Sequence, residues 1–175
     1  MAEGALIVVD MLRDFIDPRG VLTCGEAGRA IVPAVEREIQ RALAEGRDVY
    51  FVCDRHLEDD AEFRQFPRHA VEGTWGAQII DELTVPAGAR IVPKRRYSGF
   101  YASGLDLLLR ERGTRALTVV GVCTQICVLY TTADARERGY GVTVNRNAVA
   151  SFDEAAHRWA LHELESTLGA TLVDR

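Results

Sequence analysis

Short apolar runs alternate along the chain with longer segments whose apolar residues recur every three to four positions. Six runs have the length and β-branched character of buried strands, at residues 5–9, 48–53, 89–93, 116–122, 140–145 and 170–174. Four segments between them have the period of a helix and end at a glycine: 31–46, 104–113, 127–139 and 153–169. Strands buried on both faces and separated by helices predict an α/β fold, a three-layer αβα sandwich with a six-stranded, mostly parallel sheet.

The length and composition predict one domain. The chain has 175 residues, of which 47% are hydrophobic, enough for one substantial core and too few for two comfortable ones. No repeat, low-complexity tract or flexible linker divides the sequence, so we expect a single domain over residues 1–175. Residues 54–75 form a long stretch without periodicity, and a connection of that length is usually functional.

Charge and cysteine content exclude several classes of protein. The formal net charge is -5, and the densest basic run is only Lys94-Arg95-Arg96, so we expect no nucleic-acid partner. No apolar run is long enough to cross a bilayer, and the N-terminus does not have the pattern of a signal peptide. Four cysteines are too few for a disulfide scaffold. We therefore expect a cytoplasmic protein with reduced thiols and no membrane partner.

Reactive side chains follow four of the predicted strands. The first strand ends at Asp10, the second at Asp54 and the third at Lys94, and the fourth leads into Cys123 and Cys127. In open α/β sheets, ligands bind at the carboxyl ends of the strands. The sequence therefore predicts two acids, a base and a thiol at one edge of the sheet.

Cys127 is the better candidate nucleophile of the two cysteines. Thr124 is a suitable N-cap, which would place Cys127 in the first turn of a helix, where the helix dipole lowers the pKa of a thiol. Cys123 ends the apolar strand and is expected to face the core or the floor of a site. Alternatively, both cysteines are small buried hydrophobic residues, the commoner role of a free cysteine.

Asp10 and Lys94 favour a chemical role. An aspartate directly after a buried strand is costly to bury without a partner. Taken alone, Asp10 also suits a turn or helix cap, and Lys94 a solvated loop. Together with a thiol, the carboxylate and the ammonium could pass a proton from sulfur to a leaving group.

Asp54, His56 and His69 form a candidate metal site. Residues 54 and 56 point the same way in an extended chain, and His69 lies at the far side of the long loop. An aspartate with two histidines suits zinc, manganese or iron, with positions open for water or substrate. The alternative is a solvated turn aspartate with two exposed histidines.

Five segments carry a family resemblance, and they occur in the family's order over almost the whole chain. They are VVDMLRDF (8–15), DRH (54–56), FPRHAVEGTWGAQI (66–79), Lys94 with YSGF (97–100), and GVCTQICV (121–128). With these segments the sequence resembles the isochorismatase-like cysteine hydrolases, and within them the nicotinamidase (pyrazinamidase) branch.

The resemblance implies a catalytic triad of Cys127, Asp10 and Lys94. Asp10 would accept the thiol proton and later pass it to departing ammonia, while Lys94 would hold Asp10 and support the thiolate. The family has a cis peptide at the start of the nucleophile loop, here Val122–Cys123, and the N–H groups of Cys123 and Cys127 would form an oxyanion hole. The implied reaction is hydrolysis of nicotinamide to nicotinate and ammonia through a thioester, as part of NAD salvage.

The resemblance also implies the metal ligands and the pocket. Asp54, His56 and His69 match the family's ligand positions, and Glu62, which stands where many members have a further histidine, is a candidate fourth ligand. We expect this ion to be zinc, with manganese and iron as the alternatives, and to bind the pyridine nitrogen of the substrate. Glu58, Asp59 and Asp60 are expected in a hydrated acidic loop. Candidate substrate-binding residues are Phe15, Phe66, Val122 and Cys123, with Tyr97 and Phe100 as further aromatic candidates that, like the two phenylalanines, suit core packing equally well.

Two other functions stay open at this stage. One is a family relative that acts on a different small amide or on isochorismate, and the other is a binding protein that keeps the fold without catalysis. The resemblance further implies assembly into a homo-oligomer. His157 and His162, in the last predicted helix, are expected to be surface or packing residues.

Overall fold

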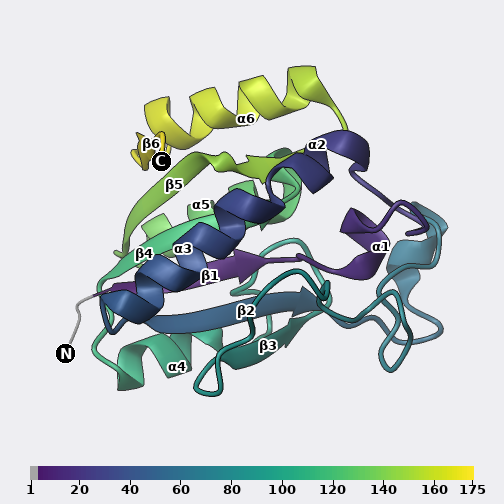
Figure 1. Ribbon diagram of the computed structural model, residues 1–175, viewed down its shortest axis with the longest axis horizontal. Coiled ribbons are helices and arrows are strands. Elements are labelled where there is room, and N and C mark those ends of the chain that lie inside the picture. The colour runs from purple at the N-terminus through teal and green to yellow at the C-terminus, as the bar shows by residue number, and fades with distance from the viewer. Residues whose placement is uncertain (1–3) are drawn as a thin grey trace.

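A computed structural model describes residues 4–175 and shows one six-stranded sheet with helices on both faces (Figure 1). Every pair of neighbouring strands is parallel. The strand order is β3-β2-β1-β4-β5-β6, with bounds β1 (Gly4–Val9), β2 (Asp48–Asp54), β3 (Arg90–Lys94), β4 (Ala116–Val122), β5 (Gly141–Ala150) and β6 (Thr171–Val173). The predicted three-layer α/β architecture is confirmed, and residues 1–3 of the expected 1–175 domain lie outside the described range.

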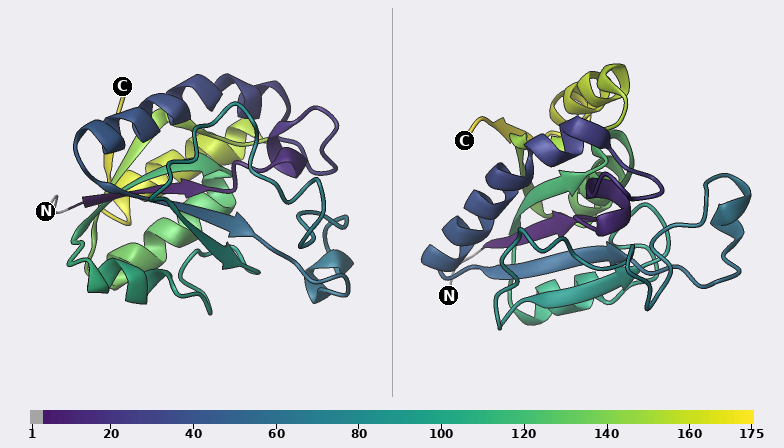
Figure 2. Two further views of the ribbon diagram at one scale, coloured as in Figure 1. Left: turned by 60° about the horizontal axis from the view of Figure 1, so that its bottom comes forward. Right: turned by 45° about the vertical axis from the view of Figure 1, so that its right-hand side comes forward.

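Helices cover the two faces of the sheet because β1, β2 and β4 are buried on both sides. Figure 2 shows α3 on one face and α4 and α5 on the other. In β1, Leu6 and Val8 belong to the core cluster that contains residues of α3, whereas Ile7 and Val9 belong to the cluster that contains residues of α4 and α5. The helices are α1 (Arg13–Ile16), α2 (Gly25–Ala30), α3 (Val32–Ala44), α4 (Leu105–Glu111), α5 (Leu129–Glu137) and α6 (Glu154–Ser166). Two shorter turns are the 3₁₀ helix η1 (Ala61–Arg64) and the π-helical turn η2 (Thr124–Val128). Within residues 4–175, no helix has the length and apolar character needed to span a membrane.

The structure differs from the sequence prediction in its shortest helices and in the length of β5. The helices α1, α2 and η1 have four to six residues each, too few to show a helical period. Strand β5 continues to Ala150 instead of ending at residue 145, and its pairing with β4 shifts register between Val119 and Gly121. This irregularity lets the second half of β5 reach the same sheet edge as the end of β4.

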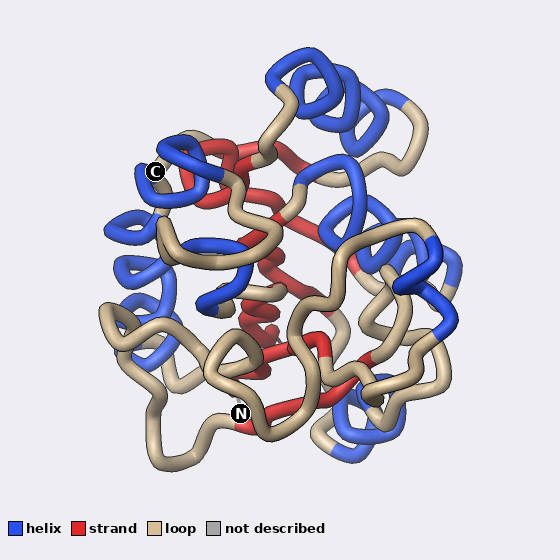
Figure 3. Tube along the Cα trace, turned by 90° about the vertical axis from the view of Figure 1, so that its right-hand side faces the viewer, coloured by secondary structure: helices blue, strands red, loops and turns tan. Residues whose placement is uncertain are grey.

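The carboxyl ends of the strands face one side of the molecule, where the longest loops gather (Figure 3). Strand β1 lies between β2 and β4, so the connections that leave the sheet centre run in opposite directions on its two sides. Such a switch point leaves a crevice at the strand ends, which is where ligands bind in open α/β sheets. The candidate site lies there.

Candidate active site

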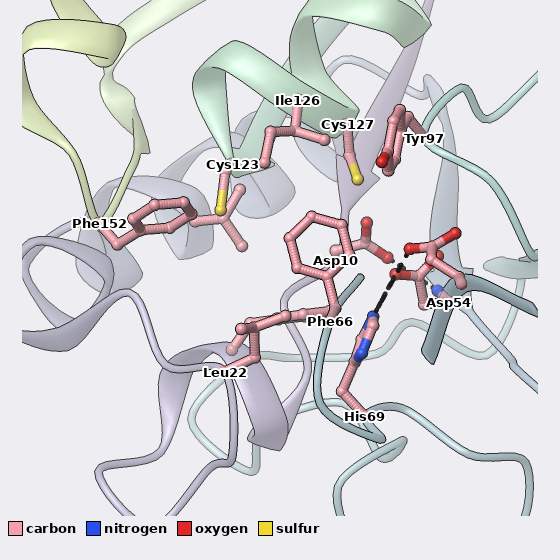
Figure 4. A pocket seen from close by; sticks show the side chains of 13 residues that line it. Asp10, Leu22, Asp54, Phe66, His69, Tyr97, Cys123, Ile126, Cys127 and Phe152 are labelled. Atoms are coloured by element: carbon pink, nitrogen blue, oxygen red, sulfur yellow. Dashed lines mark hydrogen bonds and ion pairs between the residues drawn. The ribbon is translucent and has the colours of Figure 1, made fainter. Parts of the chain in front are cut away.

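Four side chains meet at the carboxyl ends of four neighbouring strands, β3, β2, β1 and β4. Asp10 follows β1, Asp54 ends β2, and Cys127 lies in η2, after β4 (Figure 4). Lys94 ends β3. The strand register places Asp54 opposite Lys94. All four side chains are buried, although three of them are ionisable acids or bases that avoid the interior when unpaired.

Lys94 is at the centre of this group. Its Nζ lies 2.8 Å from Asp10 Oδ2, 2.5 Å from Asp54 Oδ1 and 3.4 Å from Cys127 Sγ. An oxygen of Asp10, an oxygen of Asp54 and the sulfur of Cys127 all lie within 4.8 Å of one another. The structure therefore brings together the three residues of the predicted triad, in an arrangement that allows proton exchange between sulfur and carboxylate.

The backbone around Asp10 fixes its carboxylate. The Asp10 N–H donates to the carbonyl of Val52 at 2.9 Å, and the N–H of Asp54 donates to Asp10 Oδ1 at 2.8 Å. Asp10 has a positive φ of 51°, which is uncommon for a residue other than glycine. These bonds leave Oδ2 directed to Lys94, so the carboxylate is oriented before any substrate binds.

The buried charges set the protonation states of the group. Burial and the neighbouring Asp54 raise the pKa of Asp10 from 3.8 to about 6, although Lys94 opposes the shift. Burial alone would lower the pKa of Lys94, but Asp10 and Asp54 outweigh it and raise that pKa well above 10.5. Asp10 thus has a pKa near the neutral range in which a general base works best.

The resting state of Cys127 differs from the prediction. Burial raises the pKa of its thiol well above 9.0, with Lys94 opposing, so the expected lowering of the pKa was wrong. A neutral thiol needs a base to remove its proton before its sulfur can act as a nucleophile. The Asp10 carboxylate is adjacent and can serve as such a base.

Thr124 does not cap the helix as predicted. Cys123 is the N-cap residue of η2, and the Thr124 hydroxyl lies 2.8 Å from Nδ1 of His157 in α6. Cys127 consequently lies in the π-helical turn before α5, not in the first turn of an α-helix. His157, expected to be a surface or packing residue, packs beside the turn that carries Cys127.

The three predicted metal ligands converge next to Lys94. One ligand atom each from Asp54, His56 and His69 lies within 4.8 Å of the other two. Glu62 Oε1 lies 4.0 Å from His56 Nε2 and 3.9 Å from His69 Nε2. The buried Nε2 of His56 has no hydrogen-bond partner among the described residues, since Asp54 Oδ2 is 3.6 Å away. A buried lone pair facing two carboxylates and a second imidazole is what a divalent cation would satisfy.

The other ring nitrogens of the histidines are already bonded. His56 Nδ1 lies 3.0 Å from Asp60 Oδ2, and His69 Nδ1 lies 2.7 Å from the carbonyl of Pro67. Each Nδ1 therefore carries the proton, and each Nε2 keeps a free lone pair for a metal. The prediction of a hydrated loop was wrong for Asp60, whose other oxygen accepts the N–H of Glu62 at 3.0 Å and caps η1. Glu58 and Asp59 are exposed, as expected.

A cavity opens above both groups. Figure 4 shows aromatic and aliphatic side chains around it, with the carboxylates and His69 to one side. All four predicted substrate-binding residues line it, and its wall consists of Phe15, Leu22, Phe66, Tyr97, Val122, Cys123, Ile126 and Phe152. Phe100 does not reach the cavity, because it packs in the core against the ring of Tyr140.

Three wall residues were missed by sequence reasoning. Leu22 and Ile126 gave no signal, because each is one apolar residue in a loop or turn. Phe152 lies two residues after the end of β5 and would have been found by the strand-end rule, had that strand been extended to Ala150. The Val122–Cys123 peptide that leads into η2 is cis, as the resemblance implies.

Comparison with known proteins assigns the described residues to the family that the sequence resembles. A family model described as Isochorismatase domain matches residues 4–175. The structure is similar to that of the nicotinamidase/pyrazinamidase PncA from Bacillus subtilis, with 36% identity, a TM-score of 0.94, and 99% of this chain and 100% of that chain covered. It is also similar to the pyrazinamidase of Pyrococcus horikoshii in complex with zinc, with 35% identity, a TM-score of 0.94, and 99% and 100% covered.

A third solved structure has a different substrate in its name. It is the N-carbamoylsarcosine amidase from Thermoplasma acidophilum, with 34% identity, a TM-score of 0.90, and 99% of this chain and 96% of that chain covered. The structural similarity and the family match cover the same residues. This chain therefore belongs to the isochorismatase family of hydrolases.

Proposed function

We propose that the protein is a metal-dependent cysteine amidohydrolase that converts nicotinamide to nicotinate and ammonia, a cytoplasmic step of NAD salvage. The observation that carries this proposal is one aromatic-walled cavity with two reactive groups at its base. One is the thiol of Cys127 with Asp10 and Lys94, and the other is the set of four metal ligands. The similarity to nicotinamidase and pyrazinamidase structures supports the same substrate class.

The proposed reaction begins with the thiol. Asp10 takes the proton from Cys127 Sγ as the sulfur attacks the carboxamide carbon, which gives a tetrahedral adduct. The backbone N–H groups of Cys123 and Cys127 stabilise the oxyanion of this adduct. Asp10 then returns the proton to the amide nitrogen, ammonia departs, and a thioester remains. Water, deprotonated by Asp10, attacks the thioester to release nicotinate and restore the thiol.

Lys94 keeps its positive charge while the thioester forms and while it is hydrolysed. Its ammonium contacts Asp10, Asp54 and Cys127, so it lowers the energy of the thiolate form and holds Asp10 in place. Because its pKa is raised well above 10.5, it does not donate its proton near neutral pH. Its role is therefore electrostatic.

The residues that would hold the divalent ion are Asp54, His56, Glu62 and His69, and the zinc complex of the Pyrococcus relative supports zinc as that ion. When bound, the ion supplies a ligand position for the pyridine nitrogen and so restricts how the carboxamide is presented. Phe15 and Phe66, whose rings lie 5.5 Å and 6.2 Å from that of His69, would pack against the substrate ring.

A second candidate is hydrolysis of a small non-aromatic amide or carbamoyl compound. The similarity to the N-carbamoylsarcosine amidase favours it. Such a substrate has no ring nitrogen for a metal, so its hydrolysis would not need the cluster of His56 and His69.

The test is ammonia release from nicotinamide, pyrazinamide, benzamide and N-carbamoylsarcosine, each with the metal-loaded and the chelator-treated protein. We expect nicotinamide and pyrazinamide to be hydrolysed fastest, with rates that fall on chelation and recover with zinc. Benzamide, which matches nicotinamide in shape but lacks the ring nitrogen, is expected to react far more slowly. Preference for N-carbamoylsarcosine without any effect of chelator would instead support the second candidate.

A further inference from the structure

Two cysteines that the proposed mechanism does not use as nucleophiles are in direct contact. The Sγ atoms of Cys24 and Cys123 lie 3.2 Å apart, although the residues are 99 positions apart in sequence. Cys24 is buried at the N-cap of α2, and Cys123 is half-buried at the N-cap of η2. The four cysteines are free in the structure. The contact therefore joins the start of α2 to the start of η2 through a pair of reduced thiols.

We propose that Cys24 and Cys123 are an oxidative modification site, which an oxidant of the peroxide class converts into a disulfide. Cys123 lines the cavity beside Cys127, so a small oxidant can reach it from the substrate side (Figure 4). One sulfur attacks the peroxide and becomes a sulfenic acid with release of water, and the second displaces the hydroxyl group as another water. Together the thiols lose two electrons and two protons, and the peroxide becomes two molecules of water.

The pair is arranged to form this bond with little movement. A disulfide has an S–S distance of about 2.05 Å, so the sulfurs must approach by roughly 1.2 Å. Contact with Cys24 and burial raise the pKa of the Cys123 thiol well above 9.0, so this sulfur is protonated and reacts slowly.

Both sulfurs belong to segments that shape the cavity. The N–H of Cys24 donates to the carbonyl of Phe15 at 2.8 Å, and Leu22, two residues before Cys24, lines the wall. The carbonyl of Cys123 accepts the N–H groups of Ile126 and Val128, at 3.0 and 3.2 Å, within the turn that carries Cys127. Closing the disulfide therefore draws the nucleophile turn toward the loop before α2.

The disulfide is expected to lower activity because catalysis depends on the position of that turn. A displacement of about 1 Å in a catalytic geometry can cost on the order of 10²-fold in rate. This part of the inference rests on the proposed function, since Cys123 and Cys127 supply the proposed oxyanion hole. Formation of the bond itself is independent of the substrate.

The test treats the wild type, Cys24→Ala, Cys24→Ser and Cys53→Ala with diamide, which accepts the same two electrons and two protons. Remaining thiols are alkylated, and tryptic peptides are analysed by mass spectrometry. The expected product joins peptide 20–29 to peptide 116–136, with the alkyl label on Cys127. Cys53 is buried and outside the pair, so Cys53→Ala is the matched control and is expected to form the same link.

Nicotinamide hydrolysis is measured on the same samples. We expect the wild type and Cys53→Ala to lose activity on the order of 10²-fold and to regain it with dithiothreitol, while both Cys24 variants keep theirs. Absence of the link, a link to Cys127, unchanged activity in the linked protein, or equal loss in the Cys24 variants would each overturn the inference. If the untreated protein does not hydrolyse nicotinamide, the proposed function fails, whereas the peptide map still decides whether this site exists.

Discussion

Replacing Lys94 by methionine tests the charge arrangement at the base of the site. Lys94 is the chain's only lysine, and its ammonium is buried between Asp10 and Asp54, at 2.8 and 2.5 Å. Methionine has a similar length but no charge, so Lys94→Met leaves two buried carboxylates facing each other without a cation. Their mutual repulsion and the loss of solvation then both favour the unfolded chain.

The size of the effect follows from buried ion pairs in general. Removing one partner costs about 3–5 kcal/mol, because the other charge is left unpaired. For a chain of 175 residues, this corresponds to a decrease in Tm of roughly 6–20 °C. The free energy of unfolding is measured by urea titration in the presence of a chelator, so that no bound cation replaces the ammonium.

Two further variants test whether the loss of stability comes from the buried ion pairs of Lys94. Arg95→Met removes a neighbouring but exposed cation and is expected to change stability by no more than about 0.5 kcal/mol. The double variant Asp10→Asn with Lys94→Met removes one of the two carboxylates as well, and it is expected to be more stable than Lys94→Met alone. If Lys94→Met stays within about 1 kcal/mol of the wild type, the charges are not paired as described.

The remaining predictions concern residues that contact the metal ligands or the turn that carries Cys127. Asp60→Asn weakens the acceptor for His56 Nδ1 and is expected to lower zinc affinity by about 10- to 100-fold, measured by competition with a chromophoric chelator, while the exposed Asp59→Asn leaves it unchanged. Burial, aided by Arg158, lowers the pKa of His157 below 6.5, so the unfolded chain binds this proton first. The contribution of His157 to the free energy of unfolding is therefore complete above pH 6.5 and decreases as the pH falls toward the pKa of the folded state. His157→Gln is expected to reduce the slope of the free energy of unfolding against pH, measured by urea titrations at several pH values. An unchanged slope would show that His157 does not contribute.

Much of the fold and the central part of the site followed from local patterns. Continuous apolar runs locate the strands because a parallel sheet buries both of its faces, as Leu6 and Ile7 show on opposite sides of β1. Asp10, Asp54 and Lys94 could be placed together because the residues that follow parallel strands share one edge. The hydrogen-bonded environment of each of these residues could not be read from the sequence.

The features that the sequence did not reveal depend on contacts between distant segments. Thr124 has the pattern of an N-cap, but its hydroxyl bonds His157, which is 33 residues away. Asp60 lies in an acidic run typical of a hydrated loop, yet its two oxygens bind His56 and the N–H of Glu62. The pKa of Cys127 depends on burial, which a favourable position near a helix start does not disclose. The Cys24–Cys123 contact has no local signal at all.

The central claim is that the sulfur of Cys127 attacks the carboxamide of nicotinamide. The most direct measurement is the rate of nicotinate formation by the zinc-loaded wild type, Cys127→Ala and Cys123→Ala, each first shown to be folded. We expect Cys127→Ala to form no nicotinate above the uncatalysed rate, and Cys123→Ala to turn over at a reduced rate. Comparable rates for Cys127→Ala and the wild type would contradict this claim.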